Sequence, residues 1–457
     1  MKLYNTLSGQ VEEFVPSDGN LVKMYVCGVT PYSSTHVGHA LSYVMFDTLR
    51  RYLEHKGYEV RHVQNFTDID DKIIQRAQES GVSEDELVEE FIGDYFDTMD
   101  ALNIQRASEY PRATREIPRI IDAISGLIDR GHAYPAAGDV YFRVTSKDDY
   151  GKLSHRTLDS MIAGARIQVD ENKEHPMDFV LWKGAKPGEP SWESPWGPGR
   201  PGWHIECTAM SLEYLGEQLD IHGGGQDLVF PHHENEIAQS ECYTGAKPFS
   251  RYWMHNGLLQ LGSDKMSKSL GNLVSVVEAL ERYSPDAIRL YFLSSHYRSP
   301  LAYSDEGAAA VERSLERVRR ALIPGNGAGA EVEADTHRVR FAAAMDDDLN
   351  TPQAVAALFD LARDINRGRD AGQSVGSGQA ALRELGAVLG LTFVDRPAPE
   401  ADLAATPFID LLVSVRTELR AARQFALADQ IRDGLAEQGV SLEDGAQGTQ
   451  WQRQTTE

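Results

Sequence analysis

Two short motifs, far apart in the sequence, carry side chains suited to binding phosphate groups. His36 and His39 belong to the motif HVGH, and Lys265 and Lys268 belong to the motif KMSKS. Imidazoles at the start of a helix donate hydrogen bonds to phosphate oxygens, and lysines on a loop stabilise charge that develops on a leaving pyrophosphate. Each motif by itself is more often an ordinary surface turn, so neither decides the function alone.

A second set of residues suits a metal ion. Cys27 ends an apolar run, Cys207 lies far downstream, and His232 and Glu236 are four positions apart in a segment that we expect to open a helix. Residues i and i+4 share one face of a helix. Two thiolates, an imidazole and a carboxylate are ligand types that zinc takes in tetrahedral geometry. His233 is an alternative imidazole, and a lone cysteine in a core strand is more often a small buried apolar group.

Hydrophobic periodicity predicts the elements that must position these groups. Residues 21–29 are almost continuously apolar, which is typical of a strand buried on both faces of a parallel sheet. Helical spacing follows from Gly38 to Gly57, and residues 59–66 predict a second strand. A strand at 218–222 and a helix from about Pro231 resume this rhythm. We therefore expect right-handed βαβ units in an α/β domain that a long insertion splits.

Composition shifts predict six segments along the chain. Two linkers rich in Gly, Ala and Pro, at 325–334 and 396–407, separate the later helical regions. The predicted segments are the first half of a Rossmann-like catalytic domain (1–130), a connective insertion (131–200), the second half of that domain (201–270), a helical junction after KMSKS (271–324), a helical bundle (325–395) and a small C-terminal domain (396–457).

Overall composition excludes several classes of protein. Among 457 residues, 41% are hydrophobic and 25% are charged, a balance typical of globular chains. No apolar run approaches the roughly 18 residues that span a bilayer, and the N-terminus lacks the apolar stretch of a signal peptide. Three cysteines cannot form a disulfide scaffold, so we expect a protein of the reducing cytoplasm, without a membrane partner.

The net charge of −24 opposes binding to nucleic acid unless basic residues cluster locally. Two groups of three arginines recur at i, i+4 and i+7: Arg313, Arg317 and Arg320, and Arg416, Arg420 and Arg423. Each group suits contact with phosphates but is more typical of an ordinary solvated helix face. Trp451, near the C-terminus, suits stacking on a base, although a core tryptophan of a small domain is the plainer interpretation.

Taken together, the two phosphate motifs resemble the paired HIGH and KMSKS signatures of class I aminoacyl-tRNA synthetases, with Val37 in the isoleucine position. Within that family the chain is most similar to the cysteinyl-tRNA synthetases. The stretches that carry this similarity are MYVCGVTPY (24–32), NFTDIDDKI (65–73), HPMDFVLWK (175–183), PGRPGWHIEC (198–207), DIHGGGQDLVFPHHENEIAQS (220–240) and KMSKSLGN (265–272). The tail at 439–453 resembles the anticodon-binding end of the family.

The resemblance implies a fold and a reaction. The fold is a class I Rossmann-like parallel-sheet catalytic domain with an insertion, then an α-helical bundle that binds tRNA and a small C-terminal anticodon-binding domain. The reaction joins L-cysteine to ATP as cysteinyl-adenylate and passes cysteine to the 3′ end of its tRNA. We expect one zinc ion per chain, Mg²⁺ with ATP, and a monomer rather than an oligomer.

The resemblance also assigns roles to residues of this sequence. It assigns catalysis to His36, His39, Lys265 and Lys268, and the amino-acid pocket to Gly28, Thr30, Thr67, Trp203 and His222. It assigns ATP to Gly225, Asp227 and Lys268, and zinc to Cys27, Cys207, His232 and Glu236. A flexible turn is the alternative interpretation of the Gly223–Gly225 run. Cys242 matches no ligand position, and we expect it to be structural.

Zinc explains how cysteine is told from serine without an editing site. An apolar pocket rejects an isostere only weakly, whereas a thiol bound to zinc is readily deprotonated and a hydroxyl is not. Four protein ligands and the substrate thiolate would make five donors, so either the zinc shell expands or Glu236 is the labile ligand. We expect Glu236 to be that ligand.

Two other functions fit part of the sequence. The cysteine ligase of mycothiol biosynthesis shares this catalytic domain and the adenylate step but passes cysteine to an amino sugar and lacks the full anticodon-binding end. The helical segment with AMDDDLNTPQA (344–354) and the C-terminal piece favour tRNA as the acceptor. A catalytically silent relative is the second alternative, and the intact histidines and lysines of both motifs argue against it.

Overall fold

The computed structural model describes residues 1–164, 171–261, 264–265, 274–325, 327–394, 400–445 and 448–453. The chain forms two compact units, residues 1–394 and 395–457, and each is described by itself. Among the described residues, no helix combines the length and the apolar character needed to cross a bilayer.

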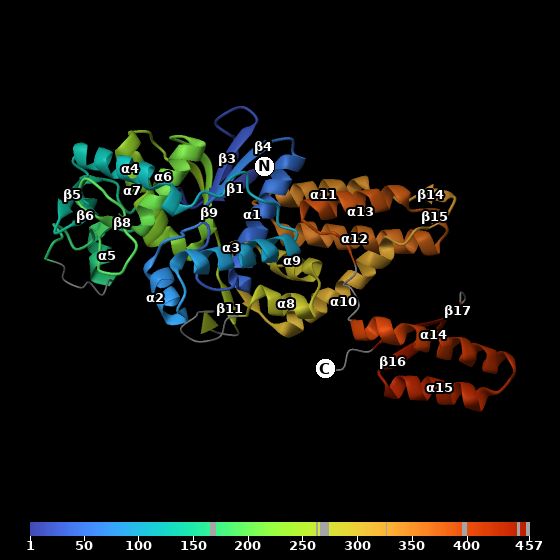
Figure 1. The fold of residues 1–457 in the computed structure, drawn as a ribbon. Coiled ribbons are helices and arrows are strands. Elements are labelled where there is room, and N and C mark those ends of the chain that lie inside the picture. The colour runs from blue at the N-terminus through green and yellow to red at the C-terminus, as the bar shows by residue number, and fades with distance from the viewer. Residues whose placement is uncertain are drawn as a thin grey trace. The chain divides into compact units, whose positions relative to one another are not determined.

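A four-stranded parallel sheet lies at the centre of the first unit, with the strand order β10-β9-β3-β4 (Figure 1). Its strands are β3 (Leu21–Val26), β4 (Glu59–Gln64), β9 (Leu219–Gly225) and β10 (Ser250–Asn256), and every neighbouring pair is parallel. The insertion enters between β4 and β9. The predicted α/β fold with a split parallel sheet is therefore confirmed.

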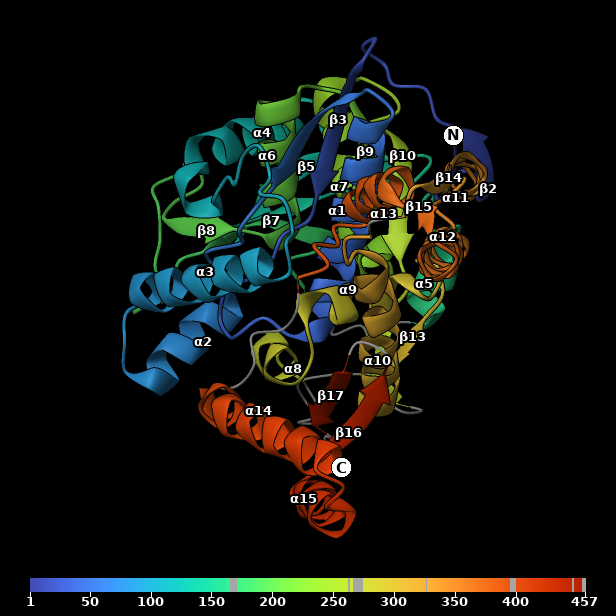
Figure 2. The same ribbon diagram turned by 90° about the vertical axis from the view of Figure 1, so that its right-hand side faces the viewer.

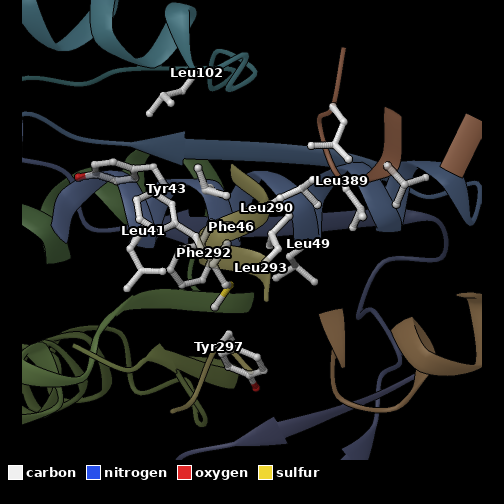
Figure 3. Close-up of a cluster of buried hydrophobic side chains, with 14 of the residues drawn as sticks. Leu41, Tyr43, Phe46, Leu49, Leu102, Leu290, Phe292, Leu293, Tyr297 and Leu389 are labelled. Atoms are coloured by element: carbon white, nitrogen blue, oxygen red, sulfur yellow. The ribbon is translucent and has the colours of Figure 1, made fainter. Parts of the chain in front are cut away.

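Helix α1 (Val37–His55) connects β3 to β4 and forms because its apolar residues recur every three or four positions. His36 caps it, since its side chain accepts a hydrogen bond from the backbone N–H of His39. Figure 3 shows Phe46 and Leu49 of α1 lying against Leu290 and Phe292 of α9 (Pro285–Leu293). The helix that starts at the first motif is thus anchored along its length by the core.

The insertion has its own antiparallel sheet, with the order β5-β6-β7-β8, and its own apolar cluster around Trp182. Its strands are β5 (Ala133–Ala136), β6 (Asp139–Phe142), β7 (Phe179–Gly184) and β8 (Gly199–Pro201). The helices between β4 and β10 along the chain are α2 (Asp71–Ser80), α3 (Glu84–Ala101), α4 (Ile117–Asp129), α5 (Leu158–Gly164), α6 (Trp203–Leu215) and α7 (Glu234–Thr244), with 3-10 turns at Ala113–Arg115 and Val144–Ser146. Of these, α4 contacts β5 and α6 contacts β7.

The rest of the first unit is mainly helical. Figures 1 and 2 show α11–α13 on the side of the parallel sheet away from the insertion. Its helices are α8 (Val276–Arg282), α9, α10 (Asp305–Ala321), α11 (Asp335–Asp346), α12 (Thr351–Asp370) and α13 (Gly376–Val388). Its short strands are β1 (Lys2–Asn5), β2 (Gln10–Glu13), β11 (Leu259–Leu261), β12 (Asp264–Lys265), β13 (Leu301–Tyr303), β14 (Gly329–Glu331) and β15 (Gln373–Ser374).

A fully buried arginine joins this helical part to α1. The guanidinium of Arg289 donates to Asp47 of α1 at 2.5 Å, to the carbonyl of Leu102 at 3.0 Å and to the carbonyl of Leu389 at 2.9 Å. Arg51 also donates to Asp47, at 2.8 Å. A buried charge is tolerated where it is paired and hydrogen-bonded, so this contact fixes α1 against both α9 and the end of α13.

In the second unit, the described residues form the helices α14 (Glu400–Ala421) and α15 (Phe425–Glu437) and a hairpin of β16 (Val440–Gly445) and β17 (Gly448–Arg453). Among those residues, the buried apolar cluster is small and holds Ile409, Leu435 and Val440. Trp451 packs against this cluster and donates to Asp410 at 2.8 Å, which supports the core interpretation of that tryptophan.

The group Arg416, Arg420 and Arg423 is not a free basic stripe. Arg416 is buried and donates two hydrogen bonds to Asp444, at 2.8 and 2.9 Å, and Arg420 also pairs with Asp444. The interpretation as a solvated helix face therefore holds for the exposed Arg420 and is wrong for the buried Arg416. Arg423 is exposed but lies beyond the end of α14, with a positive φ of 58°, so the three arginines do not form one helical stripe.

Candidate metal centre and active site

Cys27, Cys207, His232 and Glu236 meet at the carboxyl end of β3, and we call these four residues the tetrad. Their ligand atoms all lie within 4.8 Å of one another and all four side chains are buried. The Cys27 Sγ is 4.0 Å from the Cys207 Sγ and 3.7 Å from Oε1 of Glu236. Nε2 of His232 is 3.1 Å from the same carboxylate oxygen. Residues up to 209 positions apart in the sequence thus converge on one point.

The local backbone around His232 differs from the prediction. Regular helix begins at Glu234 in α7, not at Pro231, because Phe230 is extended (φ −141°, ψ 132°) and interrupts the segment before it. His233 has helical φ and ψ, so the turn from His232 to Glu236 still brings positions i and i+4 to one side. The expected proximity of His232 and Glu236 therefore holds although the helix starts three residues later.

A second possible ligand group overlaps the tetrad. Cys27, His222, His233 and Glu236 also place their ligand atoms within 4.8 Å of one another. Nε2 of His233 is 3.2 Å from the Cys27 Sγ, and Nε2 of His222 is 2.9 Å from Oε2 of Glu236. The geometry thus leaves His233 open as an alternative imidazole, while only the tetrad includes both thiols.

The imidazole and carboxylate of the tetrad shift each other's pKa. Burial by itself would lower the pKa of His232, but Glu236 and the Cys207 sulfur outweigh it and raise that pKa to about 10. Burial would likewise raise the pKa of Glu236, but His222 and His232 lower it to about 2. Glu236 is therefore an anion around neutral pH, as a ligand of a dication needs to be.

The two thiols are not equivalent. Burial raises the pKa of Cys27 well above its usual range, and the neighbouring sulfur and Glu236 add to this. The hydrogen bond from Cys27 lowers the pKa of Cys207 to about 6, against the opposing effect of burial, and His232 contributes in the same direction. Cys207 is thus the sulfur that loses its proton first, and a bound cation would be needed to hold both as thiolates.

A set of two sulfurs, one imidazole and one carboxylate fits zinc, which accepts all three ligand types. Around it lies a shell of aromatic side chains that sequence reasoning did not single out. His204 contacts His232 at 2.9 Å between Nδ1 atoms, and His255 contacts Nδ1 of His233 at 2.8 Å through Nε2. His204 lies three residues before Cys207 in α6, a helical spacing that could have marked it, whereas His255 lies in β10, far from the ligands in sequence. Both histidines hold the ring orientations of the candidate ligands.

The predicted amino-acid pocket lies in the loops that follow β3 and β4. The backbone N–H of Gly28 donates to the side chain of Asn65 at 2.9 Å, and a Cβ at Gly28 would lie 1.6 Å from the Asn65 carbonyl oxygen. The N–H of Thr67 donates to the carbonyl of Val29 at 3.1 Å. Only glycine permits this close approach, so Gly28 sets the distance between the two loops.

Three further residues predicted for the pocket have different environments. Trp203 is 40% exposed, and its ring centroid is 4.2 Å from that of His232. Thr30 lies in the loop after Cys27, and its carbonyl accepts from Tyr32. His222 is fully buried in β9, stacks on Trp253 and contacts Glu236, so its contacts are with the candidate metal ligands.

The first phosphate motif lies at the N-terminus of α1, as expected. The His36 and His39 rings stack with centroids 3.7 Å apart, and a Cβ at Gly38 would lie 3.0 Å from the His36 ring. The N–H of Val37 donates to the carbonyl of Val274 at 3.0 Å. The backbone of Lys265 lies in β12, but its side chain and all of Lys268 lie outside the described residues.

Gly225 and Asp227, predicted to meet ATP, lie at the carboxyl end of β9. A Cβ at Gly225 would lie 2.6 Å from Oδ1 of Asp227, so a larger residue there would displace the carboxylate. Asp227 lines a cavity of about 440 Å³ that Gln226, His255 and Thr6 also line. The carboxyl edge of a parallel sheet is where such folds bind ligands.

Comparison with known proteins agrees with this geometry. Residues 13–313 match the family described as tRNA synthetases class I (C) catalytic domain. A protein from Dehalococcoides mccartyi named Cysteine--tRNA ligase is 58% identical over 459 residues, which cover 100% of both chains. The chain belongs to the cysteine–tRNA ligase family. A family member from Carboxydothermus hydrogenoformans is 51% identical over 99% of this chain and 100% of its own.

Other matches extend to the helical part and to the fold. Residues 340–394 match the family described as DALR domain. The methionyl-tRNA synthetase of Mycobacterium tuberculosis in complex with methionyl-adenylate has a similar fold, with a TM-score of 0.59 at 18% identity over 81% of this chain and 89% of that one. The similarity to class I synthetases that the motifs predicted is therefore confirmed for both family and fold. The six segment boundaries stay predictions.

Proposed function

We propose that this chain activates L-cysteine with ATP and transfers it to the 3′ end of the tRNA for cysteine, with zinc bound by the tetrad. The observation that carries the proposal is the convergence of two thiols, one imidazole and one carboxylate, all buried, in a member of the cysteine–tRNA ligase family. A zinc ion in this place would supply a Lewis acid that favours a substrate thiolate over a hydroxyl.

The tetrad and its neighbours position the amino acid. Cys27, Cys207 and His232 hold the metal, and Glu236 is the ligand that we propose to be labile, because His222 competes for its second oxygen at 2.9 Å. Trp203 forms the exposed wall beside His232, where a small side chain reaches the metal. Gly28, Thr30 and Thr67 bind the rest of the substrate through the loops after β3 and β4.

The adenylate step needs no general base. The carboxylate of cysteine is already anionic, so one of its oxygens attacks the α-phosphorus, the bond to the bridging oxygen breaks, and pyrophosphate leaves. His36 and His39 bind phosphate oxygens at the N-terminus of α1, where the helix dipole favours an anion. Asp227 and Gly225 bind the ribose, Lys265 and Lys268 stabilise the leaving pyrophosphate, and Mg²⁺ accompanies ATP.

Transfer to tRNA involves the remaining parts of the chain. We propose the helical bundle (325–395) and the C-terminal segment (396–457) as tRNA-binding regions, in a cytoplasmic monomer. The DALR-domain match at residues 340–394 and the full-length similarity to cysteine–tRNA ligases support tRNA, rather than an amino sugar, as the acceptor.

The decisive experiment is charging of a tRNA transcript for cysteine with labelled cysteine, using zinc-replete and chelated protein. Serine and an amino-sugar acceptor run alongside. We expect zinc-dependent charging with cysteine only. Transfer to the amino sugar without tRNA charging would contradict the proposed acceptor, and equal charging after chelation would contradict the role of the metal.

Two cysteine variants make this test specific. Cys207→Ser removes a tetrad sulfur, whereas Cys242→Ser changes a buried cysteine in the apolar cluster of the insertion. We expect C207S to lose zinc and charging together, and C242S to keep both. If the two variants lose zinc equally, the tetrad does not hold the metal.

A further inference from the structure

One face of α10 carries three arginines whose charge has no carboxylate partner among the described residues. Arg313, Arg317 and Arg320 are all exposed. Glu312 and Glu316 of the same helix both accept from Arg319 instead, at 3.0 and 2.7 Å. The stripe therefore keeps its positive charge on a chain whose net charge is −24.

A cavity of about 590 Å³ opens beside this stripe, between α9, α10 and α12. Figure 2 shows these three helices next to one another. Its apolar lining comes from Leu290, Val311, Val355 and Phe359, and the exposed Arg317, Arg320 and Arg363 also line it. Ligand cavities of this size bury most of a small molecule or a nucleotide.

The charges around the cavity do not cancel. Asp360 is paired with both Arg340 and Arg363, at 2.9 and 2.7 Å, and Asp370 lies on the same lining. The lining has three arginines and two aspartates, which leaves one excess positive charge. Arg313, about one helical turn from the cavity, adds a second positive charge. An anion is therefore the ligand that this surface favours, and its apolar floor suits a flat ring.

We propose that this surface binds the backbone of tRNA, with phosphates on Arg313, Arg317 and Arg320 and one unstacked nucleotide in the cavity. The three arginines extend about 10 Å along the helix, enough for successive phosphates of one strand. Specific contacts to RNA commonly use unstacked bases on aromatic side chains, and Phe359 offers such a platform. This inference rests on the proposed function, since it names where that substrate is held.

Salt dependence is the measurement that tests the inference. The triple variant R313Q/R317Q/R320Q and the wild type are compared for tRNA affinity across a range of salt concentrations. Each lost phosphate contact lowers the slope of log affinity against log salt by about 0.7 to 0.9, so the triple variant should lose about 2 units of slope and at least about tenfold in affinity. The charge-conserving variant R313K/R317K/R320K should keep most of the slope.

Two further variants distinguish the contribution of the three arginines from that of the cavity and from the effect of removing any exposed arginine. Arg383→Gln removes an exposed arginine of α13 away from the cavity and should leave the slope as in the wild type. Ser314→Phe fills the cavity from α10 and should weaken tRNA binding without changing the slope. An unchanged slope in the triple variant, or an equal change in R383Q, would overturn the inference.

Cysteine-dependent pyrophosphate exchange is measured on the wild type and on every variant, because this reaction reports on the adenylate site without tRNA. If the wild type shows no exchange, the proposed function fails. If the wild type exchanges and charges, and the triple variant binds tRNA with the wild-type slope, only the arginine surface fails. The arginines are exposed, so the variants are expected to fold, and a thermal melt checks this.

Discussion

The two units of this chain stabilise polar groups in opposite ways. In residues 1–394, large apolar clusters surround charged side chains that are themselves fully buried, such as Arg289 and Glu236. Among the described residues of 395–457, the buried apolar cluster holds Ile409, Leu435 and Val440, while large apolar side chains such as Phe408 and Leu411 are 69% and 61% exposed. The first unit holds its polar groups in place with a core, and the second relies on ion pairs around one hairpin.

This difference predicts which unit can hold side chains in a precise geometry. A metal centre needs its ligands within a few tenths of an ångström, which only rigid, well-packed elements provide. A small unit with few buried contacts opens more easily and suits binding rather than chemistry. Substitutions of buried charged residues in the first unit should therefore have large effects, and those in the second unit should be small and local.

The largest effect on stability is expected at Arg289. Arg289→Met leaves Asp47 and two carbonyl oxygens without their buried donor, so the variant should lose about 4 kcal/mol of unfolding free energy. Denaturant unfolding measures it. The exposed pair Arg119–Glu213 is the matched control, and R119M should lose less than about 1 kcal/mol. A similar loss of unfolding free energy in both variants would contradict the expected difference between buried and exposed ion pairs.

The next effect is a pH dependence from His62. Burial, together with Arg50, lowers the pKa of His62 to about 3, although Asp47 acts in the opposite direction. Between about pH 6.5 and 3 the unfolded chain binds a proton that the folded chain does not, so stability falls as the pH drops through this window. The contribution of His62 is about 3 kcal/mol between pH 7 and pH 4.

The contribution of His62 is isolated by measuring the unfolding free energy of two variants at several pH values. These are His62→Phe and the control His55→Gln. His55 is an exposed histidine at the end of α1, which makes it a matched control for removal of a buried one. The curve for H62F should be flatter. Parallel curves for H62F and the wild type would show that His62 is not the group that titrates on unfolding.

The two overlapping ligand groups predict a smaller but more specific difference. His232→Ala removes the imidazole of the tetrad and should weaken zinc binding about a hundredfold or more. His233→Ala removes only a neighbour of Cys27 and should weaken it by about tenfold. Competition with a chelating dye measures both affinities, and the reverse order would identify His233 as the ligand.

The smallest effect is expected in the second unit, at Asp444. Neighbouring Arg416 and Thr449 lower the pKa of Asp444, and Asp444→Asn weakens the pairing with the buried Arg416. Because Asp444 is about half exposed, we expect a loss of about 1 kcal/mol. Hydrogen exchange should show it in α14 and α15 only. Asp429→Asn, which changes an exposed pair with Arg432, is the control. A change that spreads into residues 1–394 would contradict the separation of the two units.

Much of the site could be predicted because its residues lie on elements with strong sequence patterns. The apolar run before Cys27 and the helical spacing after Gly38 predicted β3 and α1, although the strand ends at Val26 rather than at residue 29. His232 and Glu236 were grouped by their helical spacing, and Cys207 was added by ligand type and by the resemblance to the family. In each case a local pattern decided the structure.

The parts that the sequence missed depend on contacts between distant segments. His255 of β10 lies near the tetrad although nothing in its local sequence marks it as a neighbour, whereas His204 precedes Cys207 by about one turn of α6 and could have been noticed. The spacing of Arg416 suggested an exposed arginine. Its partner Asp444 lies 28 residues away on a hairpin, so the sequence did not reveal the pairing that buries it. Tertiary pairing of this kind leaves no period in the sequence.

The wide spacing of the tetrad has a consequence for synthesis of the protein. The first ligand, at position 27, is translated about 200 residues before the last one, at position 236. At about 5 to 20 residues per second, the nascent chain carries an incomplete site for about 10 to 40 seconds. Binding of the proposed zinc ion therefore cannot guide the earliest folding of β3 and α1, and it follows synthesis of all four residues of the tetrad.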